Sequence, residues 1–357
     1  MTSEPLTVLK LNSPEQWLTA IPYMIGFPPR ESLVLLCLAG PRKRNQLTIR
    51  VDVPAAESGA ADLVAALVEP VMRAEPEHLL LVIYRDAGGR PDGLDHALVE
   101  EVELAFGAQG VDVLDSLAVR DDRWFLLAPC DDDECCPVDG RPLPEPDERI
   151  RAELVLTGHA LAESRDELVQ RLAQVRGIGL ALVGDLCDEL ADDFITAMTT
   201  GERTFNEWCD ATLELWRALL REPPRTAELP PRTVARLLVA FMSIHLRDEL
   251  AQVASEFPQP AIAALTELVR RSPDDYVPGP ATILGLVAGF EGNGCLALIA
   301  YERALTIDPT YRFAVLLHQA LTHGVRVTRD MFDGLEMPRP YRKPVVGRPK
   351  RRRRKRR

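Results

Sequence analysis

The chain has 357 residues, of which 46% are hydrophobic and 27% are charged, as in ordinary soluble globular proteins. This composition excludes a wholly disordered chain, a collagen-like fibre and a small disulfide-stapled protein, and the length suffices for two domains with separate cores. The seven cysteines are an odd number in a long chain, so we expect reduced thiols, several of them packed as small apolar residues. Cys37, inside an apolar run, is one of these.

Charge is unevenly distributed along the chain. Residues 1–150 have a net charge of −14, residues 151–340 have −9, and residues 341–357 have +11 with no acidic side chain. The acidic part repels phosphate backbones, whereas the basic end attracts anions. The N-terminus lacks the basic and apolar regions of a signal peptide, and no stretch approaches 18 consecutive apolar residues. We therefore expect a cytoplasmic protein without a membrane partner.

The first half of the chain alternates strand-like and helix-like patterns. Apolar runs of strand length cover residues 6–11, 32–39, 47–53, 79–84, 111–119 and 123–128. Helical spacing covers residues 14–25, 60–73 and 94–109, the first of these after Ser13 and Pro14, which suit a helix start. A short basic turn between the second and third runs favours a hairpin. The order predicts an α/β domain over residues 1–148, with a mixed sheet and flanking helices.

After an Asp-, Cys- and Pro-rich loop at 129–147, nearly every segment has helical spacing. The predicted helices cover residues 149–163, 165–176, 180–198, 205–220, 232–257, 260–271, 280–290, 295–307 and 312–323. They predict an all-α domain over residues 149–338.

The segment 280–309 resembles one tetratricopeptide repeat, a helical hairpin. The matching residues are Leu284, Gly285, Ala297, Tyr301, Ala304 and Pro309. A single repeat cannot form a solenoid groove, so we favour a packing role for the hairpin over peptide binding.

The loop 130–136 places three thiols beside four carboxylates. A tetrahedral zinc site needs a second ligand pair, which the sequence lacks, and neighbouring carboxylates raise thiol pKa values. We therefore predict a structural loop without metal; a metal or redox role and catalysis are the alternatives. No Walker loop, nucleophile elbow, zincin motif or dinucleotide-binding glycine motif is present in the sequence, so we predict no catalytic residue and no cofactor.

Four residues are candidates for a ligand site. Arg50 and Asp52 share one face of a predicted strand, and Arg123 begins the last strand before Cys130. They would line the mouth of the sheet, where α/β folds bind ligands. The alternative is that Arg50 and Asp52 form an ion pair at the sheet edge.

We call residues 339–357 the basic tail. Nine of its last ten residues are cationic: Arg348, Lys350, Arg351, Arg352, Arg353, Arg354, Lys355, Arg356 and Arg357. Such a segment cannot pack into a core, and we expect disorder. Its predicted partner is nucleic acid or another polyanion, bound without sequence specificity through counterion release. The alternatives are a solvated tail and one folded back on the acidic body.

Four stretches together resemble the actinobacterial domain of unknown function 4192. They are residues 26–34 (GFPPRESLV), 50–54 (RVDVP), 123–124 (RW) and 130–142, the cysteine loop and its continuation. The resemblance implies a bacterial cytoplasmic protein of unassigned activity and no catalytic residue.

Two functional hypotheses follow. The first is a non-enzymatic interaction or regulatory protein with a nucleic-acid-binding tail, which binds a protein partner through the helical domain. The second is an enzyme or small-ligand binder that uses the mouth of the α/β domain. A pocket of several hundred cubic ångströms that unites the four ligand candidates would favour the second.

Overall fold

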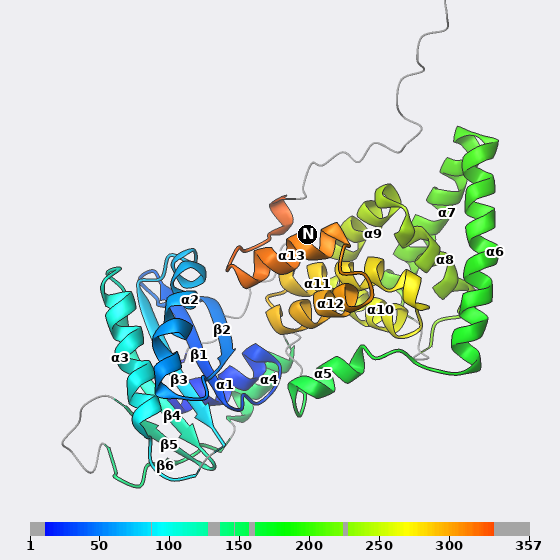
Figure 1. Ribbon diagram of the computed structural model, residues 1–357. Coiled ribbons are helices and arrows are strands. Elements are labelled where there is room, and N and C mark those ends of the chain that lie inside the picture. Colours follow the sequence, from blue (N-terminus) through cyan, green and yellow to red (C-terminus); the bar gives the residue numbers. More distant parts are fainter. Residues whose placement is uncertain are drawn as a thin grey trace, which may run out of the picture.

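The computed structural model describes residues 11–86, 88–127, 136–145, 147–156, 161–223 and 228–331. It contains an N-terminal mixed sheet with flanking helices, followed by a helical region, as the sequence predicts (Figure 1). The basic tail and residues 128–135 of the cysteine loop lie outside the described residues. The same is true of the predicted strand 6–11, apart from Leu11, which is not in a strand.

The described sheet has six strands in the order β2-β1-β3-β4-β5-β6. Their bounds are β1 Ser32–Ala39, β2 Arg44–Asp52, β3 His78–Arg85, β4 Asp112–Arg120, β5 Arg123–Leu126 and β6 Arg141–Pro142. Strands β3 and β4 are parallel, and every other neighbouring pair is antiparallel. The predicted mixed sheet and the β1–β2 hairpin are thus confirmed. The two-residue strand β6 lies within the segment that the sequence predicts as loop.

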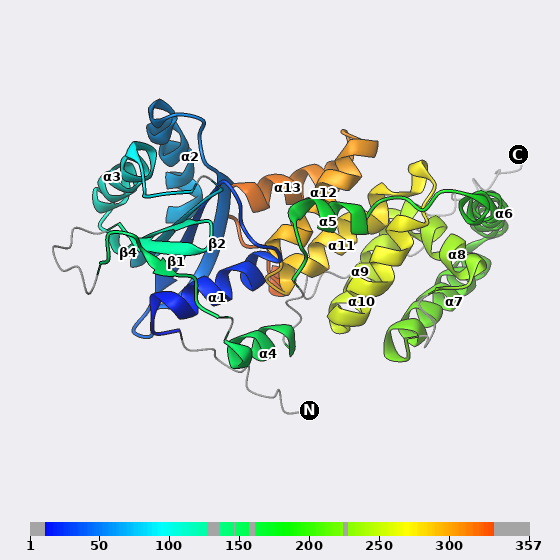
Figure 2. The same cartoon turned by 90° about the horizontal axis from the view of Figure 1, so that it is seen from below.

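Helices cover both faces of the central strands. Leu33 and Leu35 of β1 pack against α2 (Ala60–Met72) and α3 (Gly93–Gly107), whereas Val34 and Leu36 face α1 (Pro14–Ile25). Figure 2 shows α1 on the face opposite α2 and α3. Because side chains alternate along a strand, a strand covered on both faces is apolar almost throughout, as β1 and β3 are.

The β3–α3–β4 crossover sets which strand ends meet. Since β3 and β4 are parallel, their carboxyl ends, at Arg85 and Arg120, lie at one edge of the sheet. Antiparallel pairing brings Ser32 at the start of β1 beside Tyr84, and Arg123 at the start of β5 beside Arg120. One edge of the sheet therefore gathers residues from distant parts of the chain.

The C-terminal region consists of helices. Their bounds are α4 Glu148–Leu156, α5 Arg165–Arg171, α6 Ile178–Thr200, α7 Glu202–Arg221, α8 Pro231–Met242, α9 Ile244–Glu256, α10 Pro258–Arg270, α11 Pro278–Phe290, α12 Gly294–Ile307 and α13 Arg312–Thr322. Within the described ranges, no helix is both long and apolar enough to span a bilayer.

Three predicted helices are wrong in extent, and one of them, 165–176, ends at Arg171. The predicted helix 232–257 is divided into α8 and α9 by Ser243, whose backbone is extended at φ −85° and ψ 118°. The break lets α8 and α9 pack on each other and both on α7 and α11, which one straight helix cannot do. The predicted helix 149–163 is too long: α4 covers Glu148–Leu156, and residues 161–163 are not helical, with Ala162 donating its N–H to Gly26 O at 2.8 Å and Ser164 capping α5.

Helices α11 and α12 are consecutive and pack closely. Asn293 caps α12, with its Oδ1 accepting from Leu296 N–H at 3.0 Å. Gly285 of α11 lies so close to Tyr301 of α12 that a Cβ there would collide with the ring. The resemblance of this pair to a tetratricopeptide repeat stays a prediction.

The sheet and the helices are joined by contacts at several places. Helix α4 packs on α1 through Ile150 and Leu154, and Ala162 donates its N–H to Gly26 O at 2.8 Å. The buried apolar cluster behind α1 continues into the helical region. The domain limits 1–148, 149–338 and 339–357 stay predictions, and the packing of α4 puts this helix beside the sheet.

Candidate functional site

The carboxyl edge of β3 and β4 gathers five charged side chains. Glu31 precedes β1, Arg85 ends β3, Arg120 ends β4, and Asp92 and Asp95 lie at the start of α3. We call these five residues the sheet mouth. Parallel strands with a connecting helix commonly place ligand sites at this edge.

Arg120 and Asp95 form a buried pair in the sheet mouth. Arg120 is 3% exposed and Asp95 is 0% exposed. Arg120 donates from Nε to Asp95 Oδ2 at 3.1 Å and from Nη2 to the same oxygen, while Nη2 also lies 3.0 Å from Asp92 Oδ2. One guanidinium thus bonds two carboxylates, of which Asp95 is buried and Asp92 is half-exposed. With Arg85 and Glu31, the five charges of the sheet mouth sum to −1.

Asp92 and Asp95 also begin α3. Asp92 Oδ1 accepts from the N–H groups of Leu94 at 3.1 Å and Asp95 at 3.3 Å, and Asp95 Oδ2 accepts from Asp92 N–H at 3.0 Å. This reciprocal capping satisfies helix N–H groups that would otherwise lack partners. The two carboxylates therefore occupy the helix end that could otherwise bind an anion.

Arg85 links the buried pair to β1. Its Nε donates to Glu31 Oε2 at 3.0 Å, and Glu31 Oε1 accepts from Asp86 N–H at 2.6 Å. Arg85 Nη1 lies 3.8 Å from Asp95 Oδ1, and both of these buried atoms lack a hydrogen-bond partner among the described residues. Arg85 and Asp95 therefore attract each other by charge, without a direct hydrogen bond between these two atoms.

The surroundings of Asp92 and Arg120 stabilise the charged forms of both side chains. Burial acts to raise the pKa of Asp92, but hydrogen bonds from Arg120 and from Asp95 N–H, with the charges of Arg120 and Arg85, lower it overall. Burial acts to lower the pKa of Arg120, and its bonds to Asp95 and Asp92 raise it overall. Both groups are therefore ionised at neutral pH.

A pocket of about 400 Å³ lies beside the sheet mouth. Its lining contains Gly89, Arg90, Arg120, Asp121, Asp122, Arg123, Phe125 and Asp139. Arg123 donates to the carbonyl oxygens of Asp139 at 2.5 Å and Gly140 at 2.8 Å. Gly140 has φ +70°, and a Cβ there would lie 2.6 Å from the Phe125 ring, so the turn that Arg123 holds requires glycine.

The structure does not bring the four ligand candidates together. Arg50 Nη2 lies 2.6 Å from Asp52 Oδ1, and Arg50 Nε donates to Ser32 Oγ at 2.7 Å. Both lie on edge strand β2, and β1, β3 and β4 separate them from Arg123 on β5. Cys130 lies outside the described residues. Arg50 and Asp52 thus form the ion pair that the sequence offers as the alternative.

No known sequence motif identifies the residues of the sheet mouth. Arg85 and Arg120 each directly follow a predicted strand, and Asp92 stands two residues before a predicted helix. An arginine at the end of two neighbouring parallel strands is a usable signal, but the sequence alone does not tell which strands are neighbours.

The thiols of Cys37 and Cys187 are unsuited to nucleophilic chemistry. Burial raises the pKa of Cys37 to about 12, and burial with the charge of Asp188 raises that of Cys187 to about 12. The expected packing of Cys37 as an apolar residue is confirmed, since it is buried in β1. In the part of the chain that the structure describes, no three His, Cys, Asp or Glu side chains are arranged to hold a metal ion.

A family model with the description "Domain of unknown function (DUF4192)" matches residues 14–327, most of the chain. The chain belongs to the DUF4192 family. This match confirms the resemblance drawn from the four sequence stretches, and it ends before the basic tail. No curated protein and no solved structure matches the chain.

Proposed function

We propose that this DUF4192 protein is a non-enzymatic interaction protein that binds polyanions, nucleic acid above all, through its basic tail. A cytoplasmic location is part of the proposal, because that is where a bacterial protein meets nucleic acid. A regulatory role and a protein partner on the helical domain are compatible extensions of the proposal.

The observation that carries the proposal is the contrast between the paired charges of the sheet mouth and the sequence of the basic tail. Arg120 is bonded to Asp95 and Asp92, and Arg85 to Glu31. These paired charges, which sum to −1, hold strand ends and a helix start in place, and they offer little attraction to a polyanion. Residues 341–357 instead hold eleven basic side chains and no acidic one.

Physical chemistry supports a polyanion as the partner of the tail. Each cation that neutralises a phosphate releases a condensed counterion, so a cationic segment gains affinity without sequence specificity. The remaining chain has a net charge of −23 and repels DNA. The tail holds no aromatic side chain among its last ten residues, so base stacking is not expected there.

A gel-shift titration with two unrelated duplexes tests the proposal. The full chain should bind both with equal affinity, and deletion of residues 341–357 should remove the shift at physiological salt. The melting temperature should not change, because exposed terminal segments contribute little to a core. Undiminished binding by the truncated chain would assign the contact to the body, and no binding by either chain would refute the proposal.

A second candidate function is small-ligand binding in the 400 Å³ pocket beside the sheet mouth. The favouring observation is its lining by both arginines and aspartates, which suits a small ligand with anionic and donor groups. Native mass spectrometry of protein purified from its own host tests this. A retained small molecule that is lost in Arg90→Ala, which removes an exposed arginine of the lining, would support ligand binding; an unliganded mass would count against it.

A further inference from the structure

The turn between β1 and β2 presents three consecutive cations. Arg42, Lys43 and Arg44 are all exposed, and Lys43 N–H donates to Gly40 O at 2.8 Å to close the turn. Within the described ranges, none of the three forms an ion pair at 4.0 Å or less. We call Arg42, Lys43 and Arg44 the basic hairpin.

The basic hairpin lies at the opposite end of β1 and β2 from the sheet mouth, and the two places differ in how their cations are paired. In the sheet mouth, each arginine is bonded to a carboxylate. The charge of Lys43 acts on Asp115 of β4: burial raises the pKa of Asp115, and Lys43 partly offsets this rise. The positive charge of the hairpin therefore stays available to a partner.

The backbone at Lys43 gives an independent reason to assign the side chain a role. Lys43 has φ +46°, in the left-handed region where glycine or asparagine is less strained. A lysine in this position adds charge at a conformational cost of about 1 kcal/mol or more. Backbone strain of this kind is concentrated at functional positions.

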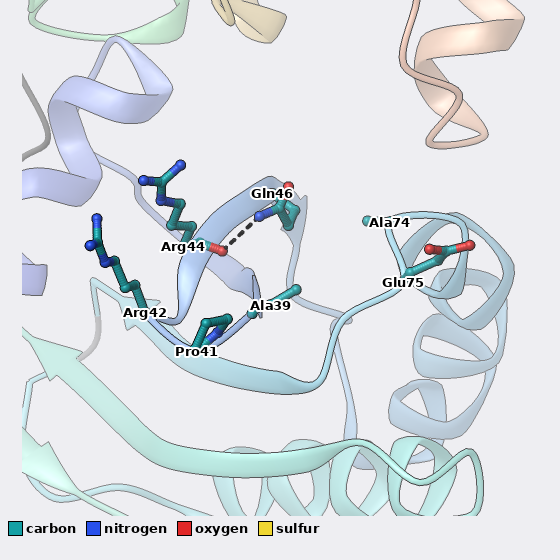
Figure 3. Close-up of a pocket in the computed structure, with 8 residues that line it drawn as sticks. Ala39, Pro41, Arg42, Arg44, Gln46, Ala74 and Glu75 are labelled. Atoms are coloured by element: carbon teal, nitrogen blue, oxygen red, sulfur yellow. Dashed lines mark hydrogen bonds between the residues drawn. The ribbon is translucent and has the colours of Figure 1, made fainter. Parts of the chain in front are cut away.

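A pocket of about 640 Å³ opens beside the basic hairpin. Figure 3 shows Arg42 and Arg44 extending from the hairpin to the same side, with Glu75 across the pocket on the turn after α2. Gln46 adds an amide whose Nε2 donates to Arg44 O at 3.2 Å. Two guanidinium groups and an amide beside an open pocket suit phosphate oxygens, which accept hydrogen bonds from each of them.

The pocket beside the basic hairpin lies near the segment that follows α13. Gly324, just after α13, packs so tightly on α2 that a Cβ there would collide with Pro70 O. Pro70 lies one turn before Ala74 and Glu75, which line the same pocket. Arg342, the first cation after residue 340, lies eighteen residues after Gly324, and a segment of this length spans up to about 60 Å when extended. One polyanion can therefore contact the basic hairpin and the tail together.

We propose that the basic hairpin is a second contact for the phosphate backbone of duplex DNA, acting with the basic tail. This inference rests on the proposed function and gives the body of the protein a share in it. Three cations on three phosphates contribute about 2.7 to the slope of log affinity against log salt. The tail supplies most of the affinity, and the hairpin fixes where the duplex lies on the folded body.

The test uses the full chain with Arg42→Gln, Lys43→Asn and Arg44→Gln combined. Lys43→Asn removes the charge and suits the left-handed backbone, so the melting temperature should not fall. The matched control combines Arg203→Gln, Arg217→Gln and Arg221→Gln on α7, which removes the same charge far from the hairpin (Figure 1). Fluorescence anisotropy with a labelled duplex measures affinity between 50 and 200 mM salt.

The affinity for the duplex should depend on salt in the same way for the parent chain and for the control variant. Over this range the parent should lose about 40-fold more affinity than the hairpin variant, the equivalent of about 2.7 in slope. A hairpin variant that matches the control in affinity and slope would overturn this inference and leave the proposed function standing. If the parent chain does not bind the duplex at all, both proposals fail.

Discussion

The guanidinium of Arg120 and the carboxylate of Asp95 form an ion pair inside the N-terminal domain, with Nε 3.1 Å from Oδ2. Asp95 belongs to the first turn of α3 and Arg120 ends β4, so the pair ties the two ends of a crossover to each other. Buried pairs of this kind are costly to break from one side, because the remaining charge is left uncompensated. The sheet mouth thus connects α3 to β4, and the loss of this connection should be measurable as a loss of stability.

Arg120→Met should destabilise the fold strongly. The substitution keeps most of the side-chain volume but leaves buried Asp95 without its main partner, at a cost of about 3–5 kcal/mol. Urea denaturation measures the change. Arg90→Met is the control, because Arg90 is exposed and its ion pair with Asp139 is worth about 0–1 kcal/mol. Equal effects of the two substitutions would contradict the structural role of Arg120.

Asp92→Asn should lower stability at neutral pH by less than about 1 kcal/mol, because Asp92 is half-exposed and asparagine also caps helices well. The pKa of Asp92 is lowered in the folded state, so its carboxylate stabilises the fold above the ordinary value of 3.8. That stabilisation is lost as pH falls through the folded-state pKa. Urea denaturation at pH 7 and pH 3 should show a difference between variant and parent that shrinks in acid; a constant difference would argue against this linkage.

Asp115→Asn should raise the stability of the fold at neutral pH, in contrast to Asp92→Asn. Burial raises the pKa of Asp115 despite the charge of Lys43, so the ionised carboxylate destabilises the folded state. This cost is present above the folded-state pKa and absent below the ordinary value of 3.8. The variant should melt higher than the parent at pH 7, with the gain shrinking in acid. Asp112→Asn, at an exposed position of the same strand, should have little effect. A lower melting temperature for Asp115→Asn at pH 7 would refute the prediction.

The packing of α11 on α12 can be tested with two glycines. A Cβ at Gly285 would collide with Tyr301 and approach Ala297 O to 2.9 Å, whereas a Cβ at Gly289 would lie 3.9 Å from Ala297 Cβ. Gly285→Ala should therefore cost about 1–3 kcal/mol through overpacking. Gly289→Ala should gain about 0.5–1 kcal/mol from helix propensity. The midpoints of urea denaturation measure the effect of each substitution. Equal shifts for Gly285→Ala and Gly289→Ala would mean that α11 and α12 do not pack as described.

Local signals predict much of the fold. Ser13, whose hydroxyl accepts from Gln16 N–H, and Pro14 mark the start of α1, and the helix runs from Pro14 to Ile25 as predicted. The basic turn predicts the β1–β2 hairpin, and apolar runs predict strands covered on both faces. The division of 232–257 is not predicted, because the extended backbone of Ser243 depends on how α8 and α9 pack on their neighbours.

The candidate site is harder to predict because it depends on strand order. Arg50 and Arg123 both lie near strand ends at the same edge, yet four steps of about 4.8 Å across the sheet separate β2 from β5. Sequence spacing fixes which residues end strands and leaves open which strands are neighbours. The pairing of Arg120 with Asp95 depends on the β3–α3–β4 crossover, which becomes visible only in the structure.

The salt dependence of duplex binding tests the central claim most directly. If the basic tail supplies the affinity through at least six phosphate contacts, log affinity against log salt should have a slope of about −5 or steeper for the full chain, and of about −8 or steeper when the basic hairpin adds three contacts. The chain without residues 341–357 should show no measurable binding at physiological salt and a slope no steeper than about −3 at low salt. Equal slopes for the two chains would contradict the account, because the tail would then make no phosphate contacts.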